Sequence, residues 1–337
     1  MGQLQPSGSG TDPVVPGASA APGGPAADYE VGLRSLSQFE LAWRKFREHR
    51  LALMGLGILA VILLAAIVGP LFLPFTPIPT TPSQIVLSGR PPFCQAYVAA
   101  TRVCTISGLV HPFGETGGLQ ADVLMLVVNG ARTSLFLGFT SMGIGVAIGT
   151  IVGAISGYLG GFIDNLLMRI VDVMLSLPIL FVILVVARFF RDARDNVWSI
   201  IIVFGLFSWM GVSRLVRSLF LSIREREFIE AARAVGVRDR RIIFRHILPN
   251  ALSPILVAAS LIIGGNIIGE AFVSFLGFGI NPTTPTWGNV LSNSLNFILQ
   301  GNWWWPLFPG LAIILTVLAV NFVGDGLRDA FDPRSRA

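Results

Sequence analysis

Few residues of this sequence have the type and spacing that covalent chemistry requires. Its three histidines, His49, His111 and His246, stand far apart in the sequence, which disfavours a shared metal site. The only lysine, Lys45, lies among aromatic and basic residues rather than in a glycine-rich loop that could hold the β- and γ-phosphates of a nucleotide. We therefore predict no catalytic residues, no metal site and no ATPase site, and we expect that the chain is not an enzyme.

The two cysteines are the residues that we expect to bond covalently to each other. Cys94 and Cys104 lie ten residues apart in a segment rich in proline and glycine. In an oxidising compartment such a pair can close a small loop, which would contribute about 3 kcal/mol by the loop-entropy relation. We predict a disulfide, and two free thiols are the alternative.

Three carboxylates, Asp172, Glu270 and Asp325, fall within or beside apolar segments. Ionisable groups in such places serve ion coupling in secondary transporters and channels. However, Asp172 and Asp325 lie near the expected ends of their segments, and no inverted repeat of broken helices is evident. We interpret the three as hydrogen-bonded structural groups, with a place in a solute path as the alternative.

The composition places the chain in a membrane. Apolar residues make up 53% of it and charged residues 13%, with a mean hydropathy of +0.71, which excludes an ordinary soluble domain. A helix needs about 20 residues to cross about 30 Å of hydrocarbon. We predict an all-α integral membrane protein with six transmembrane helices, over residues 51–73, 134–159, 166–187, 197–215, 251–272 and 306–322.

Basic residues indicate the orientation of these spans, because segments rich in arginine and lysine stay in the cytoplasm. Four basic residues lie at 44–50, before the first span, and nine arginines lie between residues 214 and 245. Six crossings return the arginines at 328–336 to the same side, so both termini are expected in the cytoplasm. The exception is a group of three arginines at 188–194, which this topology places outside. We interpret the charge as a signal of topology rather than of nucleic-acid binding.

Composition also divides the chain into regions. Residues 1–35 hold few large apolar side chains and are predicted to be a disordered cytoplasmic tail. Residues 36–75 are expected to form an interfacial helix and the first span, with partner docking as an alternative role for that helix. The remainder is divided into an extracytoplasmic segment with both cysteines (76–130), a core transmembrane domain (131–330) that contains a cytoplasmic loop (218–250), and a cytoplasmic tail (331–337).

Small residues recur along the second predicted span. Its glycines lie at short intervals, as Gly138, Gly143, Gly145, Gly149 and Gly153. Small side chains let helix backbones approach closely inside a membrane. This pattern predicts tight packing against another helix.

The cytoplasmic loop has the pattern of a docking helix. Glutamates at its start favour a helix N-terminus, and Phe228, Ala231, Ala232 and Val235 recur on one helical face. Gly236 can take the left-handed conformation that ends a helix. We predict a second short helix over residues 239–248 that ends at Pro249. The alternative for the loop is an amphipathic helix held by anionic lipid.

The order Glu230-Ala231-Ala232, then Gly236 and Leu248-Pro249, resembles the Glu-Ala-Ala loop in membrane subunits of ATP-binding-cassette (ABC) importers. In that family the loop seats a short coupling helix in a cleft on an ATPase subunit. His246 stands where many of these importers have an apolar residue, which is similar to the branch that imports dipeptides and oligopeptides.

Further stretches resemble the second, C-type permease subunit of that branch in order and spacing. They are His111-Pro112-Phe113-Gly114, Gly130-Ala131-Arg132-Thr133-Ser134-Leu135, Gly157-Tyr158-Leu159-Gly160-Gly161, residues 172–178, Ser274-Phe275-Leu276-Gly277-Phe278-Gly279, Pro285-Thr286-Trp287-Gly288-Asn289, Phe308-Pro309-Gly310 and Gly324-Asp325-Gly326-Leu327-Arg328-Asp329. The resemblance covers residues 38–335. One departure is Gln120-Ala121-Asp122, where the family often has Gly-Arg-Asp.

The resemblance implies a type I ABC importer transmembrane fold in the bacterial cytoplasmic membrane and the import of dipeptides or oligopeptides. It implies three kinds of protein partner: a second permease, two ATPase domains and an extracytoplasmic substrate-binding protein. ATP and Mg would be used by the ATPase subunits, and this chain would bind no cofactor itself. An importer of nickel or another small solute in the same family, or a secondary transporter, are the alternatives.

Overall fold

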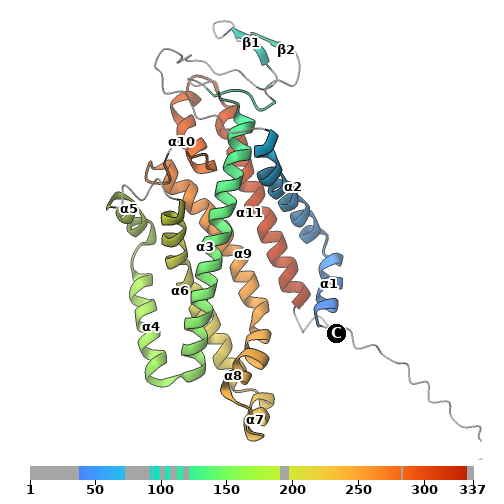
Figure 1. Ribbon diagram of the computed structural model, residues 1–337, viewed down its shortest axis with the longest axis vertical. Helices are drawn as coiled ribbons and strands as arrows, with labels where there is room; N and C mark the ends of the chain where they lie inside the picture. Colours follow the sequence, from blue (N-terminus) through green and yellow to red (C-terminus); the bar gives the residue numbers. More distant parts are fainter. Residues whose placement is uncertain are drawn as a thin grey trace, which may run out of the picture. The chain divides into compact units, whose positions relative to one another are not determined.

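Long helices make up most of the fold (Figure 1). The computed structural model describes residues 38–72, 92, 94–98, 103–106, 112–116, 121–189, 197–281 and 284–331. The tail predicted over residues 1–35 lies outside the described residues. The elements are α1 (Gln38–Glu48), α2 (Arg50–Phe72), β1 (Cys94–Val98), β2 (Val103–Ile106), α3 (Val123–Leu159), α4 (Gly161–Ser176), α5 (Ile179–Phe189), α6 (Val197–Arg224), α7 (Glu227–Ala234), α8 (Asp239–Arg241), the π-helical segment η3 (Ile242–Ile247), α9 (Leu248–Phe275), α10 (Trp287–Ile298) and α11 (Trp304–Phe331).

Five helices among the described residues are long and apolar enough to cross a membrane. They are α2, α3, α6, α11 and the continuous helix Asp239–Phe275, which joins α8, η3 and α9. They include five of the six predicted spans, and several extend beyond the predicted boundaries. The prediction of an all-α membrane fold is confirmed, with one short hairpin added by β1 and β2.

The third predicted span differs from the expectation of one continuous helix. The segment over residues 166–187 is divided between α4 and α5, because α4 ends at Ser176 and Leu177 has an extended backbone with ψ of 129°. The following Pro178 disfavours helical geometry at Leu177 through the clash of its ring with the preceding residue. Figure 1 shows α5 following α4 after this break.

Helix α3 packs closely against α6, as its glycines predicted. A Cβ atom on Gly149 would lie 2.6 Å from Cβ of Val212, and one on Gly153 would lie 2.5 Å from the Ser213 carbonyl oxygen. Gly157 continues the series, 2.7 Å from the Arg217 carbonyl oxygen. These distances are shorter than carbon contacts allow, so glycine is required for the backbones to approach this closely. Gly143 is different, since no atom lies within 4 Å of its Cβ position.

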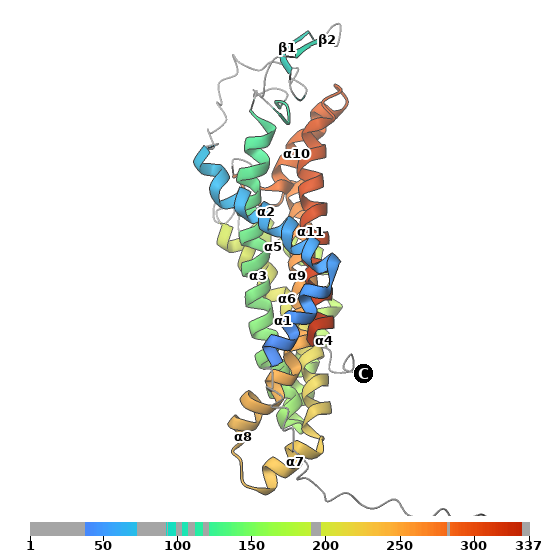
Figure 2. The same cartoon turned by 90° about the vertical axis from the view of Figure 1, so that its right-hand side faces the viewer.

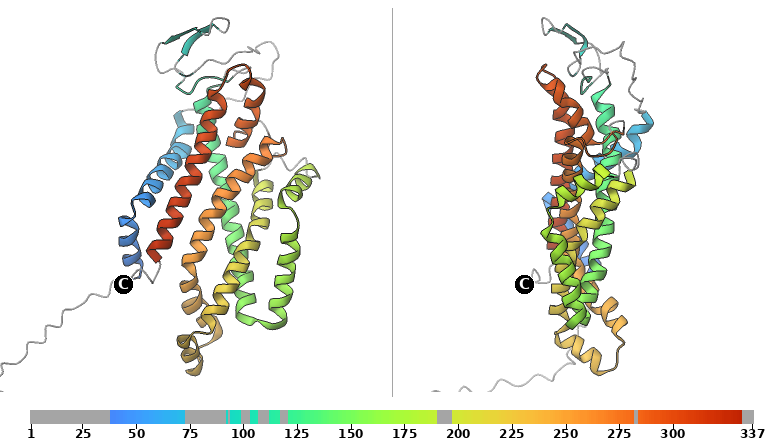
Figure 3. Two further views of the ribbon diagram at one scale, coloured as in Figure 1. Left: turned by 180° about the vertical axis from the view of Figure 1, so that it is seen from behind. Right: turned by 90° about the vertical axis from the view of Figure 1, so that its left-hand side faces the viewer.

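The predicted cytoplasmic loop (218–250) and the connection between α9 and α10 lie toward opposite ends of the helices (Figure 2). Figure 3 shows α11 beside α2 and α9, which it contacts. The N-terminal helix α1 packs on the last part of α11, with Ala42, Phe46 and Ala330 buried together. Trp43 of α1 remains 58% exposed. The loop and both of these terminal segments therefore lie toward one end of the helices, in agreement with the predicted topology.

The cysteines lie in the two strands of the hairpin. β1 and β2 are antiparallel, with Cys94 opposite Ile106 and Tyr97 opposite Cys104, and a register shift follows Cys94. The backbone thus brings the two cysteines into neighbouring strands of one hairpin. The disulfide between them stays a prediction.

Candidate functional site

The loop between α6 and α9, residues 225–247, contains a short helix that ends where the sequence predicted. α7 begins after Arg226 and has Glu227 and Glu230 in its first turn, where carboxylates favour the partial positive charge of a helix N-terminus. Gly236 has φ of 78°, and the Val237 N–H donates to the Ala232 carbonyl at 3.1 Å. This left-handed cap ends α7 and reverses the chain toward α8.

The second part of the loop corrects the prediction that a separate helix ends at Pro249. α8, η3 and α9 form one continuous helix, with Pro249 in the first turn of α9. In η3 the hydrogen bonds span five residues, as from the Leu248 N–H to the Ile243 carbonyl. Proline has no backbone N–H, and at the start of a helical segment that donor is not required. The wider π-helical turn before Pro249 leaves room for the pyrrolidine ring. The chain therefore passes Pro249 without a bend that ends the helix.

One face of α7 is open to a partner. Phe228 is 43% and Val235 80% exposed, and Ala231 between them is also exposed. Among the other predicted docking residues, Glu230, Gly236 and Pro249 are exposed, and Ala232, His246 and Leu248 are half-buried. The predicted set is thus brought to one end of the molecule, but its members do not all lie on one exposed surface.

Buried isoleucines attach the loop to the helices. Ile229 of α7 and Ile242 and Ile247 of η3 are fully buried. They belong to one core cluster with residues of α3, α6 and α9, including Phe220. This anchor was not predicted from the sequence, although an apolar residue opposite an exposed face is the available signal. Because of it, the loop is a packed extension of α6 and α9.

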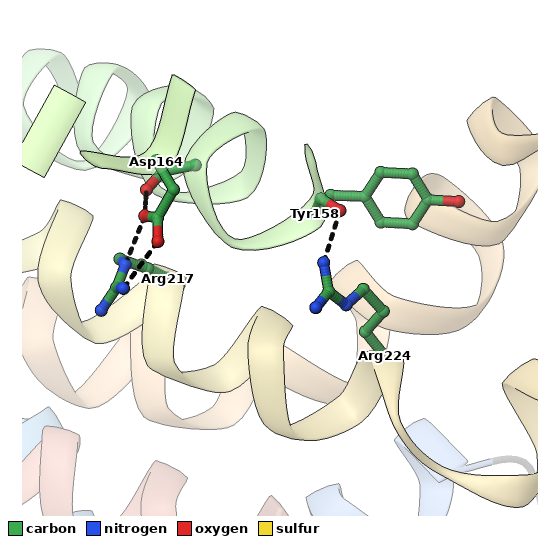
Figure 4. Close-up of polar contacts among 5 residues, drawn as sticks. Tyr158, Asp164, Arg217 and Arg224 are labelled. Atoms are coloured by element: carbon green, nitrogen blue, oxygen red, sulfur yellow. Dashed lines mark hydrogen bonds and ion pairs between the residues drawn. The ribbon is translucent and has the colours of Figure 1, made fainter. Parts of the chain in front are cut away.

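A polar contact reinforces this anchor at Tyr158, the penultimate residue of α3. The Tyr158 hydroxyl donates to Oδ1 of Asp239 at 2.5 Å, and the Arg233 guanidinium lies 5.7 Å from the centre of the Tyr158 ring. From α6, Nη1 of Arg224 donates to the Tyr158 carbonyl oxygen at 2.9 Å (Figure 4). Residues of α6, α7 and α8 therefore meet at one residue of α3.

A bidentate ion pair lies about two turns earlier along α6. Arg217 donates from Nε at 2.5 Å and from Nη2 at 2.7 Å to the two oxygens of Asp164, which also accepts from Ser156 (Figure 4). Asp164 lies in the first turn of α4, ahead of the apolar segment. The Arg217 guanidinium holds the pKa of the Asp164 carboxyl below its usual range against the opposing effect of burial. The carboxylate is thus ionised and joins α3, α4 and α6.

Arginines surround an open pocket in the second part of the loop. Its volume is about 560 Å³, and its lining comprises Arg238, Arg240, Arg241, Phe244, Arg245 and Pro249. Phe244 is 62% exposed within this positive surface. Such a combination suits an acidic protein surface with an apolar contact, and it also suits anionic lipid.

The three carboxylates of the apolar segments have separate surroundings. Asp172 pairs with Arg214 on α6, and both are about half exposed. Glu270 is buried and accepts hydrogen bonds from Ser274 at 2.7 Å and Thr286 at 2.9 Å. Asp325 is exposed. The prediction of hydrogen-bonded groups is therefore confirmed for Asp172 and Glu270. In the part of the chain that the structure describes, no group of three or more His, Cys, Asp or Glu could hold a metal ion.

Comparison with known proteins gives two family matches. Residues 149–337 match the family described as binding-protein-dependent transport system inner membrane component. Residues 37–92 match the N-terminal transmembrane domain of oligopeptide transport permease C. Together the two matches include α1, α2 and everything from the last third of α3 onward.

Relatives of similar length align over most of the chain. The oligopeptide transport system permease protein OppC of Haemophilus influenzae is 38% identical over 307 residues, which cover 91% of this chain and 92% of that protein. The dipeptide transport system permease protein DppC of Bacillus subtilis is 35% identical, with 90% and 88% covered. A solved structure of the MetNI methionine ABC transporter, in an inward-facing conformation, aligns with a TM-score of 0.52 at 21% identity. That alignment covers 61% of this chain and 96% of the MetNI chain, and it shows a shared fold.

Proposed function

We propose, on the premise that the chain belongs to the family of binding-protein-dependent inner-membrane transport components, that it carries dipeptides or oligopeptides across the membrane. It is a permease subunit, and its relatives named for dipeptide and oligopeptide transport support the substrate class. In this role the chain forms half of a translocation path and performs no covalent chemistry.

The exposed face of α7 supports a separate ATPase as the source of energy. Its apolar residues Phe228 and Val235 face outward, although the same helix is anchored by the buried Ile229. An exposed apolar face on a rigid, packed segment is suited to binding a protein and transmitting its movement. The exposed apolar face of the anchored helix α7 is therefore the observation that carries the proposal. ATP and Mg would be bound by the ATPase domains.

The remaining partners follow from the same family. A second permease would complete the path, two ATPase domains would bind on the loop side, and a substrate-binding protein would deliver peptide at the α10 end. The helix arrangement and the arginines near the loop support a bacterial cytoplasmic membrane with the loop inside.

Purification followed by reconstitution tests this function. The tagged chain is extracted from its native membrane in mild detergent, and the proteins that co-purify are identified by mass spectrometry. We expect a second permease, an ATPase with a phosphate-binding loop and a binding protein. In proteoliposomes this complex should accumulate a labelled peptide only with ATP and Mg. Solute movement by the chain alone without ATP would indicate a secondary transporter, and ATP-driven uptake of nickel but not peptide would reassign the substrate.

A further inference from the structure

We propose that Tyr158 is a positioning residue that connects the ATPase-facing loop to α3, so that transport per ATP hydrolysed depends on its hydroxyl group. This inference rests on the proposed function, because it concerns how movement of the loop reaches the membrane helices. Tyr158 itself contacts neither nucleotide nor substrate in this proposal.

The contacts of Tyr158 join elements that are distant in the sequence. Its hydroxyl group donates to Asp239 of α8, 81 positions later, and its ring lies beside Arg233 of α7. Its carbonyl oxygen accepts from Arg224 at the end of α6. A displacement of α7 or α8 therefore acts directly on the last turn of α3.

Burial of the ring makes this connection stiff. Tyr158 is 9% exposed and shares a core cluster with Phe220 of α6 and with Ile229 and Ile242 of the loop. An aromatic ring held on several sides has few alternative rotamers, so its hydroxyl group keeps its position relative to Asp239. A surface tyrosine that formed the same hydrogen bond could instead rotate away.

The neighbouring turn of α3 carries the displacement further. Gly157 lies against α6 so closely that a Cβ atom would be 2.7 Å from the Arg217 carbonyl oxygen. Ser156 donates to Asp164, which Arg217 holds from α6. The end of α3 thus cannot slide along α6 without breaking close packing and the hydrogen bond from Arg224 to the Tyr158 carbonyl oxygen, and Asp164 holds α4 to both helices. We infer that α3, α4 and α6 follow the loop as one unit.

Loss of the hydroxyl group should uncouple this unit without unfolding it. Asp239 is exposed, so water can replace the lost donor, and the isoleucine anchor remains in place. The exposed face of α7 is untouched. ATP hydrolysis should therefore continue, while a smaller part of each loop movement reaches α3.

The test compares Tyr158→Phe with the wild-type chain in the purified complex. Uptake of a labelled peptide and ATP hydrolysis are measured in the same proteoliposomes. We expect the ratio of peptide transported to ATP hydrolysed to fall roughly tenfold. The free energy of a hydrogen bond to a charged group corresponds to about a tenfold change in an equilibrium. Asp239→Ala should lower the ratio to a similar extent, and the double variant should be no worse than either single variant because both remove one interaction.

A matched control separates this role from a general loss of structure. Ser218→Ala also deletes one hydroxyl group, from an exposed α6 residue that donates to the Leu215 carbonyl oxygen of its own helix. This variant should keep the wild-type ratio. If Tyr158→Phe does not assemble with the ATPase, Asp239→Ala decides the question.

Two results would overturn the inference. One is a wild-type ratio in both Tyr158→Phe and Asp239→Ala. The other is a proportional fall of uptake and hydrolysis, which leaves their ratio unchanged and indicates a structural role alone. A wild-type complex that transports no peptide, or that contains no ATPase, would instead contradict the proposed function.

Discussion

The two ends of the helix assembly use polar side chains in different ways. At the loop end the polar contacts involve charged groups, such as Arg217 with Asp164, and apolar residues of α7 remain exposed. At the α9–α10 end the polar side chains are enclosed. Thr286 is fully buried and Asn289 is 5% exposed, and Asn289 donates to the carbonyl oxygens of Ile280, Asn281 and Thr284 at 3.0–3.2 Å.

This difference indicates a division of tasks. The α9–α10 connection directs its hydrogen bonds inward, with Trp287 donating to the Val127 carbonyl at 3.0 Å and its backbone N–H donating to Ser134 at 3.1 Å. Its buried groups hold α3, α9 and α10 together. The loop end keeps a surface free on a firmly attached segment. We therefore expect substitutions at the α9–α10 end to act on folding and substitutions at the loop end to act on coupling.

The largest effect on folding should follow from Trp287→Ala. The side chain is 1% exposed, and its removal leaves a cavity and the Val127 carbonyl without its donor. We expect a loss of about 3–5 kcal/mol in the free energy of unfolding, measured as a lower thermal midpoint in detergent. Trp303→Ala, at a residue that is 57% exposed, is the control and should change the midpoint little. Equal effects of both variants would contradict the assignment of Trp287 to a structural core.

A smaller loss is expected for Glu270→Ala. Ser274 and Thr286 would both lose the acceptor Oε1, and unsatisfied buried hydroxyl groups cost about 1–3 kcal/mol. Glu270→Gln keeps a carbonyl oxygen at this position and should retain most of the stability and of the ATP-driven uptake. Abolished uptake in a stable Glu270→Gln variant would instead favour a coupling carboxylate, as in a secondary transporter.

At the loop end, Gly236→Val should lower the free energy of unfolding less than Trp287→Ala does, and it should lower peptide uptake more directly. Its φ of 78° is strained for a β-branched residue, while no atom lies within 4 Å of its Cβ position. The left-handed conformation costs such a residue about 1–2 kcal/mol, so α7 should lose its cap and its orientation. Peptide uptake and ATPase co-purification should both fall. Gly236→Asn is the control, because asparagine tolerates this conformation. Normal peptide uptake in the Gly236→Val variant would contradict the docking role of the loop.

The smallest change in stability should come from Val235→Glu. The side chain is 80% exposed, so the free energy of unfolding should change by no more than about 0.5 kcal/mol. A carboxylate on the apolar face of α7 should nevertheless reduce the amount of ATPase that co-purifies. Leu299→Glu places the same charge on a 95% exposed residue at the opposite end and should not affect ATPase binding. Equal loss in both variants would remove the distinction between the two ends.

Local signals in the sequence predicted the features that depend on neighbouring residues. Gly236 ended α7 as expected, because a left-handed cap needs only the last turn of its own helix. The glycines of α3 likewise predicted close packing, although not that α6 is the partner. Pro249 was misjudged because its effect depends on the π-helical turn before it, which residue type alone does not reveal. The break at Leu177 had a local signal in Pro178, but the long apolar run outweighed it.

By itself, the sequence determined the membrane class, most of the spans and the position of the α7 cap, since these follow from hydrophobicity and backbone preference along the chain. Only the tertiary structure placed Tyr158 against Asp239 and Arg233, and Glu270 against Thr286. These contacts join residues of separate elements whose spacing carries no periodic signal. Their partners are selected by helix packing, which decides which side chains come within hydrogen-bonding distance.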